Sequence, residues 1–317
     1  MIKQKHLSKH RLGTLAAVYA ILTATYTHPA NSAEQLSITW MENDSEPFYI
    51  ANSASASQGG LCSKVTDLLI NALPDIKHHR VVLPQKRVGK YMDEGHLACF
   101  SCMIHRDHPT SRATYSIPTT VYPPFVILTN QQNRAAITQQ HGDPVSLVSL
   151  FTDANFIFGQ NTARKYGSKM DMIAKNTKLL EGAALSSNGS HANHAILSQI
   201  EHGYIDYAID YPFVADYYNN KNQRKITKLK IAKPEQTVLL GAIGCSSSAP
   251  NNFAKKALKK INHALQEQVL PSEQYQQNQL FWLGQSFPEF NKYYQQLVLE
   301  PLNLPANDES VKRLQPL

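Results

Sequence analysis

Apolar residues in the first part of the chain follow two different periods. Short apolar runs rich in β-branched and aromatic residues predict three strands, at residues 36–41, 79–83 and 97–104. Between these runs, apolar side chains recur at helical spacing over residues 61–73, and residues 86–94 predict a second helix that Gly95 ends. This order of strands and helices is typical of a parallel sheet with helices on its faces.

The next apolar segment, Val121–Leu128, contains two adjacent prolines, Pro123 and Pro124. Proline cannot donate a backbone hydrogen bond, so the segment does not fit a central strand. It predicts an edge strand or a crossing between two parts of the protein. Residues 130–144 are polar and predict no element, and a second set of elements begins near Val145.

The second set again alternates strands with helices. Strands are predicted at residues 155–159, 178–180, 204–209, 226–231 and 238–244. Helices are predicted at residues 163–176, 191–201, 212–218, 252–270, 273–283 and 289–299. The pattern predicts an α/β protein of two lobes, each a mixed sheet flanked by helices. The second lobe, residues 126–241, is inserted into the first, residues 34–125 and 242–317, with hinge crossings near residues 121–129 and 236–244.

The amino-terminal residues have the features of a secretory leader. Residues 1–11 are basic, residues 12–25 form an apolar run, and Ala33 supplies a small residue before a cleavage point. An amphipathic first helix is the alternative, but here the apolar residues run together instead of recurring at helical period. The run is too short to span a bilayer about 30 Å thick. We therefore predict a signal peptide over residues 1–33 and a protein located in the periplasm.

Composition and charge limit the class of protein. The chain has 317 residues, of which 42% are hydrophobic and 17% charged, enough for a core of one large or two ordinary domains. The formal net charge is +7 and falls to +3 when the four lysines and arginines of residues 1–33 are removed. Nucleic-acid binding needs a dense basic surface, so the charge gives no reason to expect a nucleic-acid partner.

Four cysteines lie in the predicted mature chain: Cys62, Cys99, Cys102 and Cys245. The periplasm is oxidising and permits disulfides, and four cysteines allow three full pairings. We expect a structural disulfide that joins Cys62 to Cys99 or to Cys102. The Cys99-x-x-Cys102 spacing falls inside a predicted strand and not at a helix start, where a reactive thiol is favoured, so we expect no redox activity.

Other chemistry-bearing motifs are incomplete. Two histidine pairs have helical spacing but no evident third ligand: His105 with His108, and His191 with His194. Ser246-Ser247-Ser248 lacks the glycine-flanked elbow of a serine hydrolase. We therefore expect no metal, no cofactor and no catalytic residue.

Three segments, taken in order, resemble a known family. They are Pro47-Phe48-Tyr49 after the first strand, Lys86-Arg87 through Gly95 before the third strand, and Ser111-Arg112-Ala113 with Tyr115-Ser116-Ile117-Pro118 after it. The chain resembles the type II periplasmic substrate-binding proteins, and within them the extracellular solute-binding family 3 of amino-acid-binding type. The resemblance covers essentially all of residues 36–285. It implies a ligand-binding cleft between two lobes.

The resemblance assigns two groups of residues to the anionic end of a ligand. Arg112 matches the family's arginine that holds the ligand carboxylate, a task that suits the forked donors of a guanidinium. The alternative is a surface arginine paired with Asp107. In the second lobe, Gln160, Asn161 and Thr162 match a polar turn whose free backbone N–H groups would bind an anionic group. Helix capping by Asn161 or Thr162 is the alternative, and the two roles are compatible.

The resemblance also implies a partner for the ligand ammonium and an aromatic lining. Asp210, just past a predicted strand, is the best match to the family's ammonium-binding aspartate, and we interpret Asp206 as a structural cap. One residue fewer separates these two acids than in the family. Trp40, Phe48 and Tyr122 are candidates for the pocket wall, with core packing as the alternative. Phe48 and Tyr122 are favoured because both lie next to prolines.

These observations predict a periplasmic solute-binding protein that captures a small polar, amino-acid-like ligand. Its partner would be the inner-membrane permease of an ABC transporter or a membrane sensor protein, and we expect a monomer. Two alternatives remain open at this point: an enzyme on the same two-lobe fold, or an interaction module that has lost its ligand.

Overall fold

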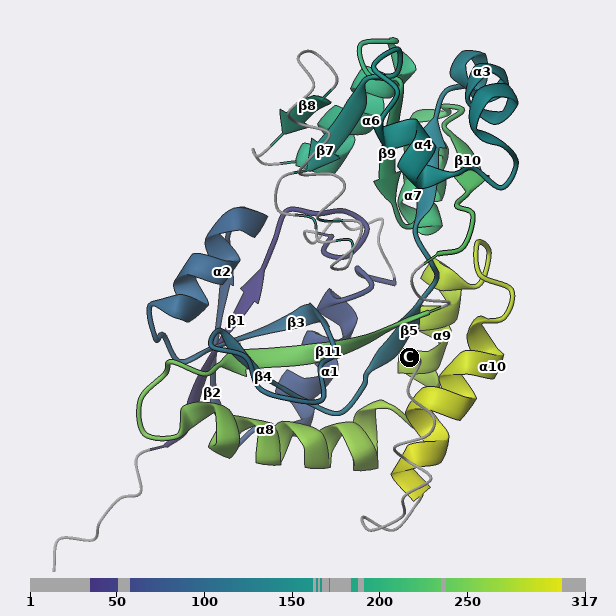
Figure 1. The fold of residues 1–317 in the computed structure, drawn as a ribbon. Coiled ribbons are helices and arrows are strands. Elements are labelled where there is room, and N and C mark those ends of the chain that lie inside the picture. Colours follow the sequence, from purple (N-terminus) through teal and green to yellow (C-terminus); the bar gives the residue numbers. More distant parts are fainter. Residues whose placement is uncertain are drawn as a thin grey trace, which may run out of the picture. The chain divides into compact units, whose positions relative to one another are not determined.

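A computed structural model describes residues 35–50, 58–161, 164, 166, 171, 184–187, 191–234 and 238–303. The predicted signal peptide, residues 1–33, lies outside these residues. So do the predicted strand at 178–180 and most of the predicted helix at 163–176. The described residues form an α/β structure built on two mixed sheets (Figure 1).

The first sheet has six strands in the order β2-β1-β3-β11-β4, with β5 paired to β11. Their bounds are β1 Ser37–Glu42, β2 Lys77–Val82, β3 Ala98–Ile104, β4 Ala113–Tyr115, β5 Thr120–Tyr122 and β11 Leu239–Ser246. β1 runs parallel to β2 and β3, as the alternation of strands and helices predicts. β11 returns from late in the chain and pairs antiparallel with β3, β4 and β5.

Helices pack on this sheet along their apolar stripes. The first three are α1 Ser63–Ala72, α2 Gln85–Asp93 and α8 Phe253–Ala264. In α8, Phe253, Ala257 and Ile261 are buried at helical spacing, while the lysines between them are exposed. α8 contacts β11 and β4, and α2 contacts β3 and β11. Figure 1 shows α2 and α8 on opposite sides of the sheet.

The chain after α8 remains helical, as predicted. The elements are η1 Leu265–Val269, α9 Glu273–Leu283, α10 Phe290–Tyr294, η2 Gln295–Leu299 and η3 Glu300–Asn303. α9 begins where the Ser272 side chain accepts a hydrogen bond from the Tyr275 backbone N–H. Among the described residues, no helix has both the length and the apolar composition needed to cross a membrane.

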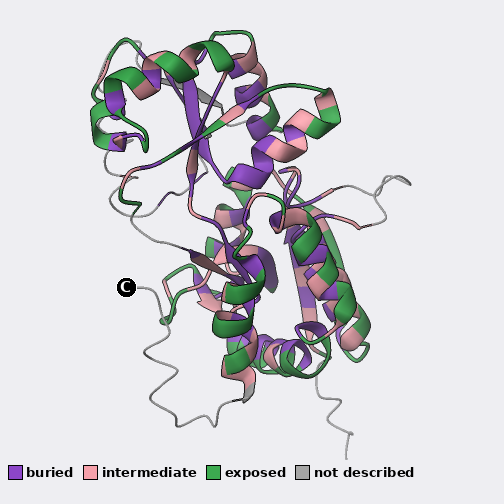
Figure 2. Cartoon of the chain, turned by 90° about the vertical axis from the view of Figure 1, so that its right-hand side faces the viewer, coloured by how far each residue is buried: buried purple, intermediate pink, exposed green. Residues whose placement is uncertain are grey.

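The second sheet has five strands in the order β10-β6-β9-β7-β8. Their bounds are β6 Val126–Thr129, β7 Phe158–Asn161, β8 Ala184–Ser187, β9 Tyr207–Asp210 and β10 Thr227–Lys230. β6 pairs antiparallel with β10 and β9, whereas β7 pairs parallel with β8 and β9. The helices of this lobe are α3 Gln131–His141, α4 Leu147–Phe151, α6 Ala192–Glu201 and α7 Pro212–Asn222. Figure 2 shows that burial concentrates on the strands of both sheets.

Two helices of this lobe, α3 and α4, were not predicted. α3 occupies residues that the sequence pattern left without an element, because only Ile137 and His141 among its eleven residues are buried. Its start is nevertheless encoded locally. The Asn130 side chain accepts a hydrogen bond of 2.8 Å from the Asn133 backbone N–H, which is the geometry of an N-cap.

The chain crosses between the two sheets twice. Residues 123–125 connect β5 to β6, and residues 231–238 connect β10 to β11, where 235–237 lie outside the described residues. Pro123 and Pro124 lie in the first connection. β11 is already paired with the first sheet at its first residue, because Leu239 lies opposite Tyr122. The predicted lobe boundary at residues 241 and 242 therefore falls inside β11, and the second crossing lies before it.

Candidate functional site

Arg164 and Asp210 form a buried ion pair in the second lobe. The Arg164 Nη2 atom lies 2.8 Å from Asp210 Oδ2, and each side chain is 10% exposed. Asp210 is the last residue of β9, and its Oδ1 atom accepts a hydrogen bond of 2.8 Å from the Tyr211 backbone N–H. The end of the strand thus holds the carboxylate, and Arg164 approaches it from the segment after β7.

Aromatic rings from both lobes enclose this pair. The Arg164 Cζ atom lies 5.3 Å from the centre of the Phe48 ring and 5.7 Å from that of Tyr211, within cation–π range. Phe48 comes from the loop after β1, whereas Tyr211 directly follows β9. Ring-to-ring contacts extend the enclosure to four more residues: Tyr122, Phe125, Tyr166 and Phe213. We call these six rings with Arg164 and Asp210 the aromatic–ionic cluster.

The backbone around Phe48 is held in place by its neighbours. The Phe48 N–H donates to the Ser45 carbonyl at 2.9 Å, and the Phe48 carbonyl accepts from the Cys62 N–H at 2.7 Å. A Cβ atom on Gly60 would lie 2.5 Å from that carbonyl oxygen. Only glycine fits this close approach, so Gly60 is required for the position of Phe48.

Burial acts on both charges of the pair. It raises the pKa of Asp210, and the Arg164 guanidinium opposes that rise. Burial by itself would lower the pKa of Arg164, but the Asp210 carboxylate and the hydroxyls of Tyr211 and Tyr166 turn this into a net increase. The guanidinium is therefore firmly charged, and the carboxylate is the partner that keeps it so.

One polar atom of the pair has no partner. Arg164 Nε is buried without a hydrogen-bond acceptor among the residues that the structure describes. An unsatisfied buried donor costs about 1–3 kcal/mol, and native proteins contain few of them. A donor left open beside aromatic rings is suited to donate to a ligand oxygen.

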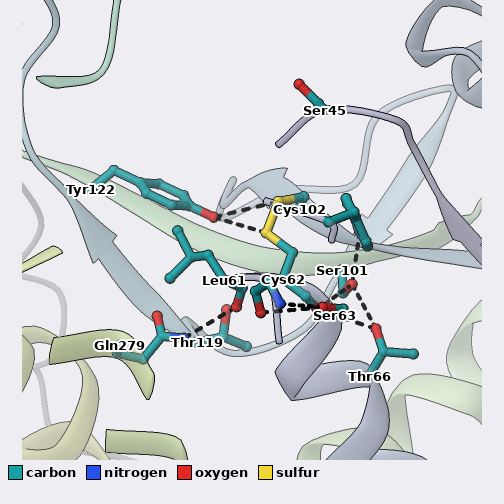
Figure 3. The surroundings of a disulfide bond; sticks show 12 residues. Ser45, Leu61, Cys62, Ser63, Thr66, Ser101, Cys102, Thr119, Tyr122 and Gln279 are labelled. Atoms are coloured by element: carbon teal, nitrogen blue, oxygen red, sulfur yellow. Dashed lines mark hydrogen bonds between the residues drawn. A yellow bond between two sulfur atoms is a disulfide. The ribbon is translucent and has the colours of Figure 1, made fainter. Parts of the chain in front are cut away.

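A disulfide borders the cluster. Cys62 and Cys102 are joined and connect the start of α1 to β3, one of the two pairings expected for Cys62. The Tyr122 hydroxyl points towards both sulfurs, at 3.7 Å from Cys62 and 3.9 Å from Cys102 (Figure 3). The pairing expected with Cys99 does not form, because Cys99 is joined to Cys245 on the adjacent strand β11.

The loop after β1 also contacts the helices of the second lobe. Asn193 Nδ2 donates to Ser45 Oγ at 3.0 Å, and Lys221 forms an ion pair with Glu46. A pocket open to solvent lies beside these contacts. Its polar and charged lining includes Asp44, Glu46, His191, His194, Tyr217 and Lys221. Nowhere in the described residues do three or more histidines, cysteines and acids gather in a way that would hold a metal ion.

The structure brings together three of the predicted site residues: Asp210, Phe48 and Tyr122. Gln160 lies on β7, next to β9, and is 8% exposed. Because Gly159 pairs with Ala208, the alternation of side chains puts Gln160 and Asp210 on opposite faces of the sheet. Its Oε1 atom is buried without a partner among the described residues.

Other predicted residues lie elsewhere. Arg112 Nε and Nη2 donate to the two carboxylate oxygens of Asp93 at 2.8 and 2.6 Å, and the arginine side chain is 50% exposed. Its partner is therefore Asp93 at the end of α2, and not Asp107 as the alternative supposed. Trp40 is fully buried in the first lobe, where its Nε1 atom donates to His78 Nδ1 at 3.0 Å.

The last two predicted site residues, Asn161 and Thr162, follow Gln160 at the end of β7. Asn161 is the last residue of β7, and Thr162 lies outside the described residues. Arg164 was missed, because no motif marks it in the predicted helix at 163–176 and its acidic partner is 46 residues away in the sequence. Tyr211 was not among the predicted site residues, although it directly follows Asp210 at the end of the same strand.

Comparison with known proteins supports the architecture. No protein-family model matches the sequence, and no curated protein matches it. A putative L-cystine ABC transporter protein from Listeria monocytogenes is 14% identical, with 79% of this chain and 97% of that one covered and a TM-score of 0.59. An ancestral arginine-binding protein bound to arginine is 16% identical, with 78% and 98% covered and a TM-score of 0.55.

A sensor protein has the same architecture. A histidine kinase sensor domain with similarity to periplasmic binding proteins is 12% identical, with 79% of this chain and 96% of that one covered and a TM-score of 0.57. These structures match nearly their whole length to the part of this chain that carries the two mixed sheets. The protein therefore has the two-lobe α/β fold of the type II periplasmic binding proteins.

Proposed function

We propose that this protein is an extracytoplasmic solute-binding protein that captures a small carboxylate-bearing ligand, an amino acid or a close chemical relative, without transforming it. The observation that carries the proposal is the buried Arg164–Asp210 pair among rings that come from both lobes. Apolar walls with a few convergent polar groups are the usual composition of a small-molecule site. The structural neighbours, which include transport proteins and a sensor domain, support the same class of function.

Three residues are proposed to contact the ligand on the basis of both the resemblance and the cluster: Phe48, Tyr122 and Asp210. Phe48 and Tyr122 would provide the wall that stacks on the ligand body. Asp210, with the arginine that it binds, would form the polar end of the site at the end of β9. Phe48 belongs to the first lobe and Asp210 to the second, so a ligand between them would hold the two lobes together, which is how hinge closure around a ligand works.

The partner and the location follow from the same proposal. A binding protein of this kind would act in the periplasm, where its two disulfides are stable. It would deliver its ligand to an inner-membrane ABC permease, or report the occupied state to a membrane sensor. Lobe closure is the change that either partner would detect.

Thermal unfolding in the presence of candidate ligands tests the proposal. The full chain would be expressed for export, purified from periplasmic extract, and scanned against amino acids, organic acids, polyamines, sugars and dipeptides. A ligand present at 100 times its dissociation constant adds about 2.7 kcal/mol to the free energy of unfolding. We expect a rise in melting temperature with carboxylate-bearing compounds. A chain that responds to none of them, and carries no small molecule in native mass spectrometry, would exclude solute binding.

A matched pair of variants locates the site. Phe48→Ala removes the first-lobe ring that contacts Arg164. We expect it to lower the affinity for the ligand found in the thermal scan about tenfold or more. The control is Phe281→Ala, because Phe281 is a 56% exposed ring on α9 outside the cluster. Equal affinities in the two variants would place the ligand away from the cluster.

A further inference from the structure

We propose that Arg164 is the anion-binding residue of this site, and that its pairing with Asp210 makes the protein select carboxylates that lack an amino group. The ligand class is then an aromatic or branched apolar monocarboxylate. This inference rests on the proposed function and specifies the ligand that the aromatic–ionic cluster accepts.

The first step is that the cation position at Asp210 is already filled. Its Oδ2 atom accepts from Arg164 Nη2 at 2.8 Å, and its Oδ1 atom accepts from the Tyr211 backbone N–H at 2.8 Å. Both oxygens are thus engaged by groups of the protein itself. A ligand ammonium would have to displace a guanidinium that is held by one carboxylate and two aromatic rings.

The second step is that Arg164 retains an open donor. A guanidinium has five N–H donors arranged for a planar acceptor, and the buried Nε–H of Arg164 has no acceptor among the residues that the structure describes. A ligand carboxylate is the planar, charged acceptor that fits this group best. Both oxygens of Asp210 are engaged by groups of the protein, so among the described residues the pair offers a donor to a ligand anion and no free acceptor to a ligand cation.

The third step concerns the other arginine. Arg112 has its Nε and Nη2 donors occupied by both oxygens of Asp93, and half of its side chain is exposed. Arg164 is enclosed by rings, where a charge-assisted hydrogen bond is less screened by water. Of these two arginines, Arg164 has the environment and the unpartnered donor that anion binding requires.

The fourth step is the shape of the walls. Phe48, Tyr122, Phe125 and Tyr211 all contact at least one other ring of the cluster, with the closest centroids, those of Phe125 and Tyr211, 4.4 Å apart. These four rings cover one another and are at most 6% exposed, so a flat or branched apolar body would stack on them only where they separate. Phe48 lies over Arg164 from the first lobe, so a separation of the lobes at this ring would open the guanidinium to the ligand.

The experiment compares matched acids and amines on the intact protein. Isothermal titration calorimetry at neutral pH would measure the dissociation constants of two matched series. The first is L-phenylalanine, 3-phenylpropanoate and phenethylamine, and the second is L-leucine, 4-methylpentanoate and isopentylamine. We expect each acid without an amino group to bind at least about tenfold more tightly than its amino acid, and the amines not to bind. Amino acids that bind as tightly as the acids, or more tightly, would overturn the inference and leave the proposed function intact. Absence of binding by every compound in the wider ligand panel would overturn the proposed function itself.

Variants separate the role of Arg164 from a structural one. In the double variant Arg164→Met with Asp210→Asn, both charges are removed together and no buried charge is left unpaired. We expect it to retain cooperative unfolding and to lose acid binding by tenfold or more. The control is Arg224→Met with Glu201→Gln, which removes an exposed ion pair in the same lobe and should leave binding unchanged. Acid binding that survives in the first double variant would overturn the assignment to Arg164.

A single variant tests the filled cation position directly. Arg164→Gln leaves Asp210 without its cation, so phenethylamine or L-phenylalanine should gain affinity while 3-phenylpropanoate loses it. An inversion of this kind would not follow from a merely loosened fold, which would weaken all ligands together. Uniform weakening, with unchanged preference between acid and amine, would contradict the inference.

Discussion

The Nη2 atom of Arg164 lies 2.8 Å from the Oδ2 atom of Asp210, and each of the two side chains is only 10% exposed. A buried ion pair of this kind contributes little net stability, because removing two charges from water costs about as much as their attraction returns. Well-packed apolar residues would serve stability equally well. The pair is therefore not explained by stability alone, which agrees with the role in ligand binding proposed above.

Removal of one partner should be far more damaging than removal of both. Arg164→Met leaves the Asp210 carboxylate buried without its cation, and we expect the free energy of unfolding to fall by about 3–5 kcal/mol. Urea denaturation followed by circular dichroism measures the change. The double variant with Asp210→Asn should recover most of the loss. A double variant as unstable as the single one would show that the two charges do not act as a pair.

The pH dependence of the single variant follows from the raised pKa of Asp210. Its pKa in the folded protein lies above the ordinary 3.8, so above that pH the folded state binds more protons at this group than the unfolded chain does. Stability contributed by the protonated form is present below the unfolded pKa and is lost as pH rises through the folded pKa. Without Arg164 to oppose burial, the pKa rises further and the loss extends to higher pH.

Denaturation of Arg164→Met at about pH 4.5 and pH 7.5 checks this expectation. The variant should be more stable at the lower pH relative to the double variant with Asp210→Asn, which has no carboxyl group to titrate. The difference between the two proteins removes the contribution of all other titrating groups. A difference that does not change between the two pH values would contradict the raised pKa.

The exposed pair of Arg112 and Asp93 should behave in the opposite way. The hydrogen bond from Arg112 lowers the pKa of Asp93, so the stability that it contributes is present above the unfolded pKa and is lost as pH falls through the folded pKa. Arg112→Ala should return the Asp93 pKa towards 3.8, measured by NMR titration of its side-chain carboxyl carbon. Because the pair is about half exposed, we expect no more than about 1 kcal/mol of destabilisation. An unchanged Asp93 titration would rule out the contact.

The fold was predictable where the local pattern matched the tertiary packing. The strands β1 and β3 and the helices α1 and α2 follow from apolar runs and helical spacing, since one face of each packs in the core. β2 follows from its apolar run, although none of its residues is buried. α3 was missed because its surface is almost entirely polar, and the N-cap at Asn130 is the one local signal that indicates where it starts. The lobe boundary was predicted at residues 241 and 242, inside β11, because an apolar run does not reveal which sheet it joins.

The candidate site was predictable in its single residues and not in its contacts. Phe48, Tyr122 and Asp210 were candidates from the family resemblance, which the neighbouring prolines and the end of a predicted strand helped to select. Arg164 has no local pattern that marks it, because its role depends on a partner 46 residues away and on a ring from the other lobe. Long-range pairing of this kind comes from the topology of the sheet, which brings the ends of β7 and β9 side by side.

The disulfide between Cys62 and Cys102 offers the last test, since it ties the first lobe together next to Tyr122. It closes a loop with a sequence separation of 40, and its removal by Cys62→Ser with Cys102→Ser should cost about 3–4 kcal/mol through the added freedom of the unfolded chain. The Tyr122 hydroxyl would lose its two sulfur neighbours, so we also expect weaker ligand binding. Cys99→Ser with Cys245→Ser is the control, because it also removes a disulfide of the first lobe but leaves the sulfurs at Tyr122 in place. Equal losses of ligand affinity in the two double variants would mean that the effect is one of global stability and not of the wall that Tyr122 forms.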